Sequence, residues 1–170
     1  MKNLLLFRTL TTNDIKNVLK IYNFHIKNGL TNFEEKLFSY DDFINFSKYI
    51  LNCNLPFIVC EKDNKIIGFA YLSKFRKKSG YRYTFENSIY LDNKFIGKGI
   101  GSILLNELIK ASSNNKDIKT IIAVIGGENV KSSIKIHKKN GFNIVGTLKK
   151  VGFKKNQWLD SIYMQKILNE

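Results

Sequence analysis

Three glycines within five residues, Gly97, Gly99 and Gly101, stand where an extended pattern ends and an apolar helical pattern begins. Glycine weakens a helix, so its repeated use at this point needs a local reason. Backbone N–H groups at a helix start attract anions, and a residue without a side chain lets a phosphate approach them closely. The stretch therefore predicts a phosphate-binding loop between a strand and a helix, with a tight turn packed through its glycines as the alternative.

The spacing of these glycines excludes two common nucleotide-binding motifs. A P-loop reads G-x-x-x-x-G-K-[ST], whereas Lys98 is followed here by Gly99. A dinucleotide fingerprint reads G-x-G-x-x-G, whereas this chain reads G-x-G-x-G. What remains is a loop of free amides at a helix N-terminus, an arrangement that suits a pyrophosphate and needs no metal ion.

The rest of the chain shows strand and helix patterns of ordinary length. Capping residues precede Ile15, Gly29 follows the first helical pattern, and Asn140–Gly141 ends the last one. Mixed strands and helices in this order predict a single layered α/β (α+β) domain over residues 1–170. The predicted strands cover residues 4–10, 56–61, 65–75, 81–91, 120–125, 143–153 and 158–168, and the predicted helices cover 15–28, 40–51, the glycine loop to 111, and 129–140.

Composition limits the class of protein further. Apolar residues make up 44% of the chain and it has one proline, so we expect a folded core without a linker or a second domain. The apolar run near the N-terminus is too short for a signal peptide or a membrane span. Cys53 and Cys60 have no C-x-x-C spacing and no His/Cys cluster, which predicts two buried thiols in a cytoplasmic protein and no bound metal.

The formal net charge is +14, from 28 Lys and Arg against 14 Asp and Glu. Such a surface attracts nucleic acid, an anionic membrane or a polyphosphate ligand. The lysines are scattered in pairs rather than gathered in one run, so a general lysine bias with a modest contribution from ligand steering explains the charge more simply. We expect neither nucleic acid nor a membrane as a partner.

The strand pattern over residues 81–91 carries a candidate general base. Residues alternate between the two faces of a strand. A carboxylate between hydroxyl groups, just before an anion-binding loop, suits proton abstraction, and a solvated glutamate is the alternative. One face carries Thr84, Glu86, Ser88 and Tyr90, the other carries Phe85, Ile89 and Leu91, and Asn87 interrupts this second, apolar face.

The last helical pattern carries a polar stripe. Asn129, Ser133 and His137 recur every four residues and therefore share one side of the helix. A histidine exchanges protons near neutral pH, so His137 is a candidate proton carrier. A lone helical histidine is more often a packing or surface residue, and both interpretations stay open.

The segment FIGKGIGSILLNEL, residues 95–108, resembles the acetyl-CoA loop and helix of the GNAT superfamily of N-acetyltransferases. Four further segments are similar to the phosphinothricin acetyltransferase group of that superfamily, and they follow in order across nearly the whole chain. The superfamily pattern has Gln or Arg where this chain has Ile96, a position that contributes mainly its backbone amide. The four segments are TNFEE, FRKKSGYRYTFENSIYL, NVKSSIKIHKKNGF and GTLKKVGFKKNQWLD.

The resemblance implies the GNAT fold, a mixed and mostly antiparallel seven-stranded sheet with a central splay, flanked by about four helices. It implies that acetyl-CoA lies in the splay, between residues 88–91 and 120–125. It also implies that the chain forms a homodimer, for which the last two strands offer a surface. The implied cofactor-binding residues are Ser88, Ile89, Tyr90, Leu91, Ile96, Gly97, Lys98, Gly99, Ile100, Gly101, Ser102, Asn129 and Ser133.

The same resemblance implies direct acetyl transfer to the α-amine of a small, oxygen-rich amino acid, such as phosphinothricin, methionine sulfoximine or methionine sulfone. Glu86 would take the amine proton, and a backbone N–H of its strand would stabilise the oxyanion. His137 stands where many GNAT enzymes have a tyrosine acid. Arg76 and Arg82 would hold anionic oxygens, since guanidinium groups bind them in a bidentate way. The acceptor pocket would be lined by Phe33, Arg76, Tyr81, Arg82, Tyr83 and Thr84.

Two other functions stay open from the sequence. The first is a different acceptor on the same fold: an aminoglycoside, a polyamine or a protein N-terminus. The +14 charge argues against polycationic acceptors, because like charges repel. The second is a nucleic-acid-binding module, which lacks a recognisable signature here and leaves the glycine loop unexplained.

Overall fold

The computed structural model describes residues 4–127 and 130–168, and its elements follow the predicted order. Within these residues, seven strands form one sheet in the order β1-β2-β3-β4-β5-β7-β6. Neighbouring strands are antiparallel except β4 and β5, which confirms the mixed, mostly antiparallel sheet. The strands are β1 (Leu6–Thr9), β2 (Phe57–Lys62), β3 (Lys65–Lys74), β4 (Thr84–Leu91), β5 (Thr120–Gly126), β6 (Asn143–Lys154) and β7 (Gln157–Ile167), and the helices are α1 (Ile15–Asn28), α2 (Tyr40–Asn52), α3 (Ile100–Ser113) and α4 (Val130–Lys139).

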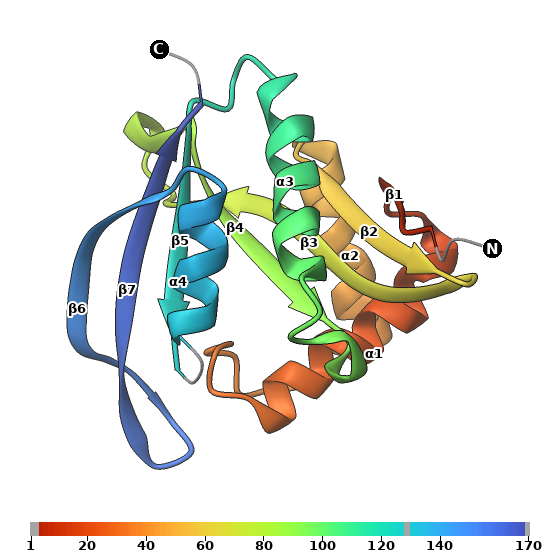
Figure 1. Ribbon diagram of the computed structural model, residues 1–170, viewed down its shortest axis with the longest axis horizontal. Helices are drawn as coiled ribbons and strands as arrows, with labels where there is room; N and C mark the ends of the chain where they lie inside the picture. Colours follow the sequence, from red (N-terminus) through yellow and green to blue (C-terminus); the bar gives the residue numbers. More distant parts are fainter. Residues whose placement is uncertain (1–3, 128–129, 169–170) are drawn as a thin grey trace.

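Helices cover both faces of this sheet (Figure 1). On one face, Tyr22 of α1 packs against Phe43 of α2 and Tyr90 of β4, with ring centroids 5.5 and 5.2 Å apart. On the other face lie α3 and α4, and His137 of α4 reaches Asn87 of β4. Because neighbouring residues of a strand point to opposite faces, β4 presents Tyr90 and Asn87 to different helix pairs.

Local sequence signals account for most element boundaries. Ser39 Oγ accepts a hydrogen bond from the backbone N–H of Asp42, whose carboxylate accepts from the backbone N–H of Ser39, so a capping box starts α2. Asp63 and Asn64 have φ angles of 50° and 58°, which joins β2 to β3 in a tight hairpin. None of the helices in residues 4–127 and 130–168 has the length and apolar content that a membrane span requires.

The largest error in a predicted boundary lies at the start of β4. The strand predicted over residues 81–91 begins only at Thr84, because Ser79–Tyr81 forms a 3-10 turn. The backbone N–H groups of Tyr81 and Arg82 bond the carbonyl groups three residues before them, which prevents these residues from joining the sheet. Tyr81 and Tyr83 therefore belong to the loop between β3 and β4.

Arg8 of β1 joins three elements at the β1 edge of the sheet. Its guanidinium donates to both carboxylate oxygens of Asp14, at 2.7 and 2.9 Å, and to Glu61 of β2 at 2.9 Å. The hydrogen bonds from Arg8 are the main reason that the pKa of Asp14 falls from 3.8 to about 2. Asp14 precedes Ile15, so this charge cluster fixes the start of α1 to the sheet.

Candidate functional site

The two central parallel strands part after a short stretch of pairing. β4 pairs with β5 only at Thr84, Phe85 and Glu86, although β3 accompanies β4 to Leu91 and β7 accompanies β5 to Gly126. The strands therefore diverge beyond Glu86, as Figure 1 shows. This divergence is the predicted central splay, and its open end lies toward the loop that starts α3.

The register of β3 and β4 decides which backbone groups of β4 line the splay. The N–H of Phe75 bonds the carbonyl of Thr84, so the even-numbered residues of β4 direct their N–H and C=O groups toward β3. The odd-numbered residues direct theirs toward β5, and Ile89 and Leu91 lie beyond the paired stretch. The carbonyl of Leu91 bonds the Nε2 atom of His25 at 2.7 Å. The N–H groups of Ile89 and Leu91 thus face the splay with no partner strand.

The glycine loop takes the form that anion binding requires. Gly97 and Gly99 have left-handed φ angles of 79° and 78°, and a Cβ added at either position meets no atom within 4 Å. In the described part of the chain, the N–H groups of residues 97–101 have no backbone acceptor, whereas those of Ile96 and Ser102 already bond backbone carbonyls. Five of the seven predicted amides thus form an open anion nest at the N-terminus of α3.

Glu86 lies where the two strands begin to part. Its side chain is half-buried, and burial raises the pKa of its carboxyl group above the ordinary value. The ion pairs found in the described residues do not include it. A half-buried carboxylate with a raised pKa and no cationic partner suits a group that takes a proton from a substrate.

A cluster of aromatic hydroxyl groups accompanies Glu86 on the face covered by α1 and α2. Tyr71 of β3 lies directly opposite Ser88, and the ring centroid of Tyr22 is 5.2 Å from that of Tyr90. Burial raises the pKa of Tyr22, Tyr71 and Tyr90, and the charge of Glu86 adds a smaller upward contribution at Tyr90. Sequence reasoning missed Tyr22 and Tyr71, although the pairing of β3 with β4 places Tyr71 on this face.

His137 and Asn87 form a buried pair on the opposite face. The Nδ1 atom of His137 lies 2.8 Å from the carbonyl of Ser133, and its Nε2 atom lies 3.1 Å from Asn87 Nδ2. A carbonyl only accepts and an amide nitrogen only donates, so His137 is neutral with its proton on Nδ1. Burial lowers the pKa of His137 and thereby favours this neutral form. Asn87, the exception on its strand face, is thus explained by its contact with α4.

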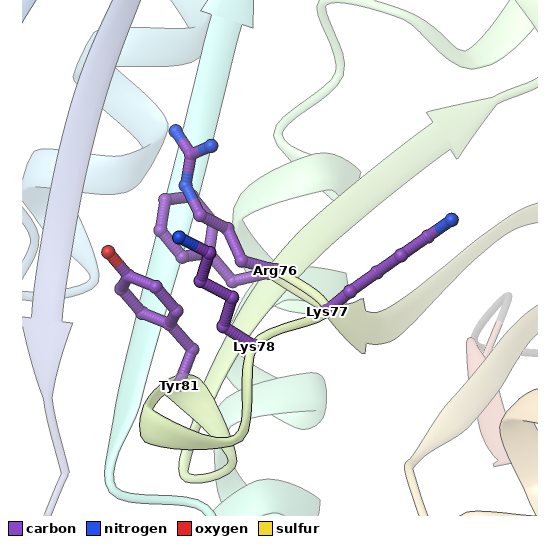
Figure 2. A pocket seen from close by; sticks show the side chains of 5 residues that line it. Arg76, Lys77, Lys78 and Tyr81 are labelled. Atoms are coloured by element: carbon purple, nitrogen blue, oxygen red, sulfur yellow. The ribbon is translucent and has the colours of Figure 1, made fainter.

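The loop between β3 and β4 carries an open, basic hollow of about 500 Å³, lined by Phe75, Arg76, Lys77, Lys78 and Tyr81. In Figure 2 the Arg76 guanidinium, the Lys78 ammonium and the Tyr81 hydroxyl point to one side, whereas Lys77 points away. Arg82 does not line this hollow. Its guanidinium lies 4.6 Å from the ring centroid of Tyr83 and donates to the carbonyl of Ser79.

Phe33 does not lie near this hollow. Its ring covers Gly126 at the end of β5, where an added Cβ would be 2.6 Å from Phe33 Cζ. Tyr83 lies at the start of β5, because its carbonyl accepts from the N–H groups of Lys119 and Thr120. Thr120 and Gly126 are six residues apart, about 20 Å along a strand. Phe33 and Tyr83 therefore lie near opposite ends of β5.

The remaining predicted residues lie on α4 and around it. Asn129 falls outside the described residues. Ser133 is half-buried, and its carbonyl accepts from the ring of His137. Asn140, which the sequence indicated only as a helix stop, donates from Nδ2 to Ser102 Oγ at 3.2 Å and so ties the end of α4 to the start of α3. Residues 4–127 and 130–168 hold no group of three His, Cys, Asp or Glu side chains that could bind a metal.

The parted strands and the anion nest together have the form that suits an extended ligand with phosphate groups. Comparison with protein families identifies the class of protein to which the chain belongs. The model of the acetyltransferase (GNAT) domain matches residues 7–163. The chain belongs to the GNAT acetyltransferase family, and it is an N-acetyltransferase enzyme.

Individual relatives agree with this assignment. The chain is 35% identical to the phosphinothricin N-acetyltransferase of Alcaligenes faecalis over 162 residues, which cover 95% of this chain and 82% of that one. It is 29% identical to the L-methionine sulfoximine/L-methionine sulfone acetyltransferase of Salmonella typhimurium, covering 92% and 91% of the two chains. Among solved structures, a phosphinothricin acetyltransferase from Sinorhizobium meliloti in complex with acetyl-CoA superposes with a TM-score of 0.91 at 34% identity, covering 98% and 89% of the chains.

Proposed function

We propose that this enzyme transfers the acetyl group of acetyl-CoA to the α-amine of small, oxygen-rich amino acids of the phosphinothricin, methionine sulfoximine and methionine sulfone type. The observation that carries the proposal is the splay that opens between β4 and β5 toward a five-amide anion nest. The nest would hold the pyrophosphate of acetyl-CoA, and the N–H groups of Ile89 and Leu91 would pair with the amide groups of its extended arm. The acetyl-CoA complex of the Sinorhizobium meliloti relative supports this choice of cosubstrate.

The chemistry would begin at Glu86. An amino acid arrives with its amine protonated, and Glu86 would remove that proton directly or through a water molecule. The free amine would then attack the thioester carbonyl, and a backbone N–H of β4 would stabilise the oxyanion. The carbon–sulfur bond breaks, CoA leaves as a thiolate, and the second proton of the amine passes to the thiolate or to water. A thiol has an ordinary pKa of about 8.5, so this leaving group does not depend on a strong acid.

Positively charged side chains would attract and orient the acceptor. Arg76 and Lys78 direct their cationic groups to one side of the loop before β4, and Glu86 is the third residue of β4. A positive entrance favours an amino acid that carries a carboxylate and a second polar group over a polyamine. The sulfone and phosphinothricin substrates named for the two relatives fit this preference.

A homodimer through β6 and β7 is also part of the proposal. β6 is an edge strand, and Ile144, Val145, Leu148, Phe153 and Trp158 of the hairpin are each at least 46% exposed. Apolar side chains gathered on an exposed edge mark an association surface. The two cysteines are free, which supports a reducing compartment such as the cytoplasm. Cys60 is buried as predicted, whereas Cys53 is only half-buried, so the prediction of two buried thiols was wrong for Cys53.

The proposal is tested by an acceptor screen with purified enzyme and acetyl-CoA, in which release of free thiol is followed. The panel holds the proteinogenic amino acids, methionine sulfone, methionine sulfoximine, phosphinothricin, spermidine, an aminoglycoside and a peptide with a free N-terminus. We expect the highest kcat/KM for the sulfone, sulfoximine or phosphinothricin. A higher value for spermidine, the aminoglycoside or the peptide would refute the proposed acceptor class.

A further inference from the structure

Lys154, the last residue of β6, is a buried cation that the proposed chemistry does not use. Its residue is 3% exposed, and its Nζ atom donates to the backbone carbonyls of Ile26, at 2.8 Å, and Asn32, at 2.5 Å. The ion pairs recorded in the described residues do not include it. Burial is the main cause that lowers the pKa of this amine. A buried lysine of this kind holds the backbone segments whose carbonyl groups it binds, which an exposed surface lysine does not do.

The two carbonyl groups belong to the end of α1 and to the connection that follows it. Ile26 lies in the last turn of α1, where helix carbonyls lack intrahelical partners and carry partial negative charge. Asn32 lies in the connection between α1 and α2. Lys155 donates in the same way to the carbonyl of Asn28, but from an exposed position. The β6–β7 hairpin thus holds the end of α1 and residues 30–33 from more than a hundred residues away in the chain.

This segment lies against the far end of β5. A Cβ on Gly127 would collide with the carbonyl of Leu30, and Gly127 itself has a φ of 77°. The ring of Phe33 lies on Gly126 and on Gly152, and a Cβ on Gly152 would collide with it. Gly126 belongs to the part of β5 that no longer pairs with β4. Residues 30–33 therefore form a wall at the open end of the splay.

We propose that Lys154 is a positioning residue for catalysis: it fixes residues 30–33 from the β6–β7 hairpin so that Phe33 bounds the acceptor site on the side of the sheet that carries Glu86, because Gly126 beneath Phe33 shares that face with Ile122, the partner of Glu86. This inference rests on the proposed function, because it assigns an acceptor to that side. Without the Lys154 ammonium, two buried carbonyls lose their donor and the wall is free to move. The acceptor then loses orientation, whereas the acetyl-CoA nest at α3 lies on other elements and keeps its form.

The test compares Lys154→Met with Lys155→Met, because the second variant removes a neighbouring lysine whose carbonyl partner is exposed. We expect Lys154→Met to raise KM for methionine sulfone by about tenfold or more, with the Kd for acetyl-CoA changed less than twofold. Lys155→Met is expected to stay within twofold of the parent protein in both quantities. Gly152→Ala, which displaces the Phe33 ring and leaves Lys154 in place, is expected to raise the same KM, and it carries the test should Lys154→Met fail to fold.

Amide hydrogen exchange gives a second readout that needs no acceptor. Exchange of residues 30–36 is expected to accelerate in Lys154→Met and to stay unchanged in Lys155→Met. Equal exchange in the two variants overturns the anchoring role, and faster exchange with an unchanged KM overturns the role in acceptor binding. If the parent protein binds acetyl-CoA but does not acetylate methionine sulfone, the proposed acceptor class fails, and the exchange result still decides whether Lys154 anchors the segment.

Discussion

Replacing His137 by phenylalanine distinguishes a structural histidine from a catalytic acid. Both ring nitrogens of His137 are engaged, Nδ1 with the carbonyl of Ser133 and Nε2 with the amide of Asn87. The only ring proton of this neutral tautomer already bonds a backbone carbonyl, so none is directed at a leaving thiolate. A phenyl ring has nearly the same shape, and the position already packs edge-on against Phe142 at 5.0 Å between centroids. We therefore expect His137→Phe to keep kcat within about fivefold of the parent, well short of the 10²-fold or more that loss of a general acid costs.

The expected loss of stability in His137→Phe follows from the buried polar groups that this variant leaves without a partner. Asn87 is 7% exposed, and its Oδ1 atom already has no partner among the described residues. His137→Phe also removes the acceptor for Asn87 Nδ2, and a buried group left without its partner costs about 1–3 kcal/mol. For a domain of this size, a loss of about 2 kcal/mol lowers Tm by about 4–8 °C. The double variant Asn87→Leu/His137→Phe removes the whole polar pair, so it is expected to recover most of that loss.

Urea denaturation of the parent, the two single variants and the double variant measures this coupling directly. We expect an interaction free energy of about 1–2 kcal/mol between positions 87 and 137. Steady-state kinetics on the same four proteins measures kcat with methionine sulfone. The reasoning is refuted if His137→Phe lowers kcat more than 10²-fold while acetyl-CoA still binds, or if the single losses simply add in the double variant.

Three further predictions follow from other parts of the structure. Gly99→Val places a branched residue at a φ of 78°, so acetyl-CoA affinity measured by calorimetry is expected to fall at least tenfold, whereas Gly80→Val in the exposed loop leaves it unchanged. The pKa of Asp14 drops from 3.8 to about 2, so its pairing contributes about 2 kcal/mol above pH 4 that is lost as pH falls through 2; urea denaturation of Asp14→Asn should show that loss already at pH 7. Arg76→Ala is expected to lower kcat/KM for methionine sulfone about tenfold or more, with an unchanged acetyl-CoA Kd in the same assay series; an unchanged kcat/KM contradicts its role.

The sequence predicted the strands, the helices and the anion loop because these depend on local patterns. Alternation, capping residues and glycine spacing are all readable within about ten residues of chain. The boundary error at Tyr81 arose where a 3-10 turn replaced an extended pattern rich in aromatic residues. Such a turn depends on how the loop closes between β3 and β4, which local propensity does not specify.

The parts of the site that the sequence did not reveal all depend on long-range contacts. Lys154 lies 122 residues from Asn32, whose carbonyl it binds, and no periodic pattern marks it. Asn87 looked like a break in an apolar face because its partner lies 50 residues further along, on α4. Phe33 and Tyr83 lie near opposite ends of β5, an arrangement that no local pattern indicates. Side-chain chemistry identified such residues as polar or aromatic, while only the packed fold showed what each one contacts.

The central claim, acetyl transfer assisted by Glu86, is tested most directly by the pH dependence of kcat/KM for methionine sulfone in the parent and in Glu86→Gln. Burial raises the pKa of Glu86, so the parent should lose activity on the acid side through a group that titrates above the ordinary carboxyl range. Glu86→Gln should lack that limb, and its deficit should shrink as pH rises and the free amine becomes abundant. A deficit that stays constant at every pH, or no deficit at all, would contradict proton transfer to Glu86.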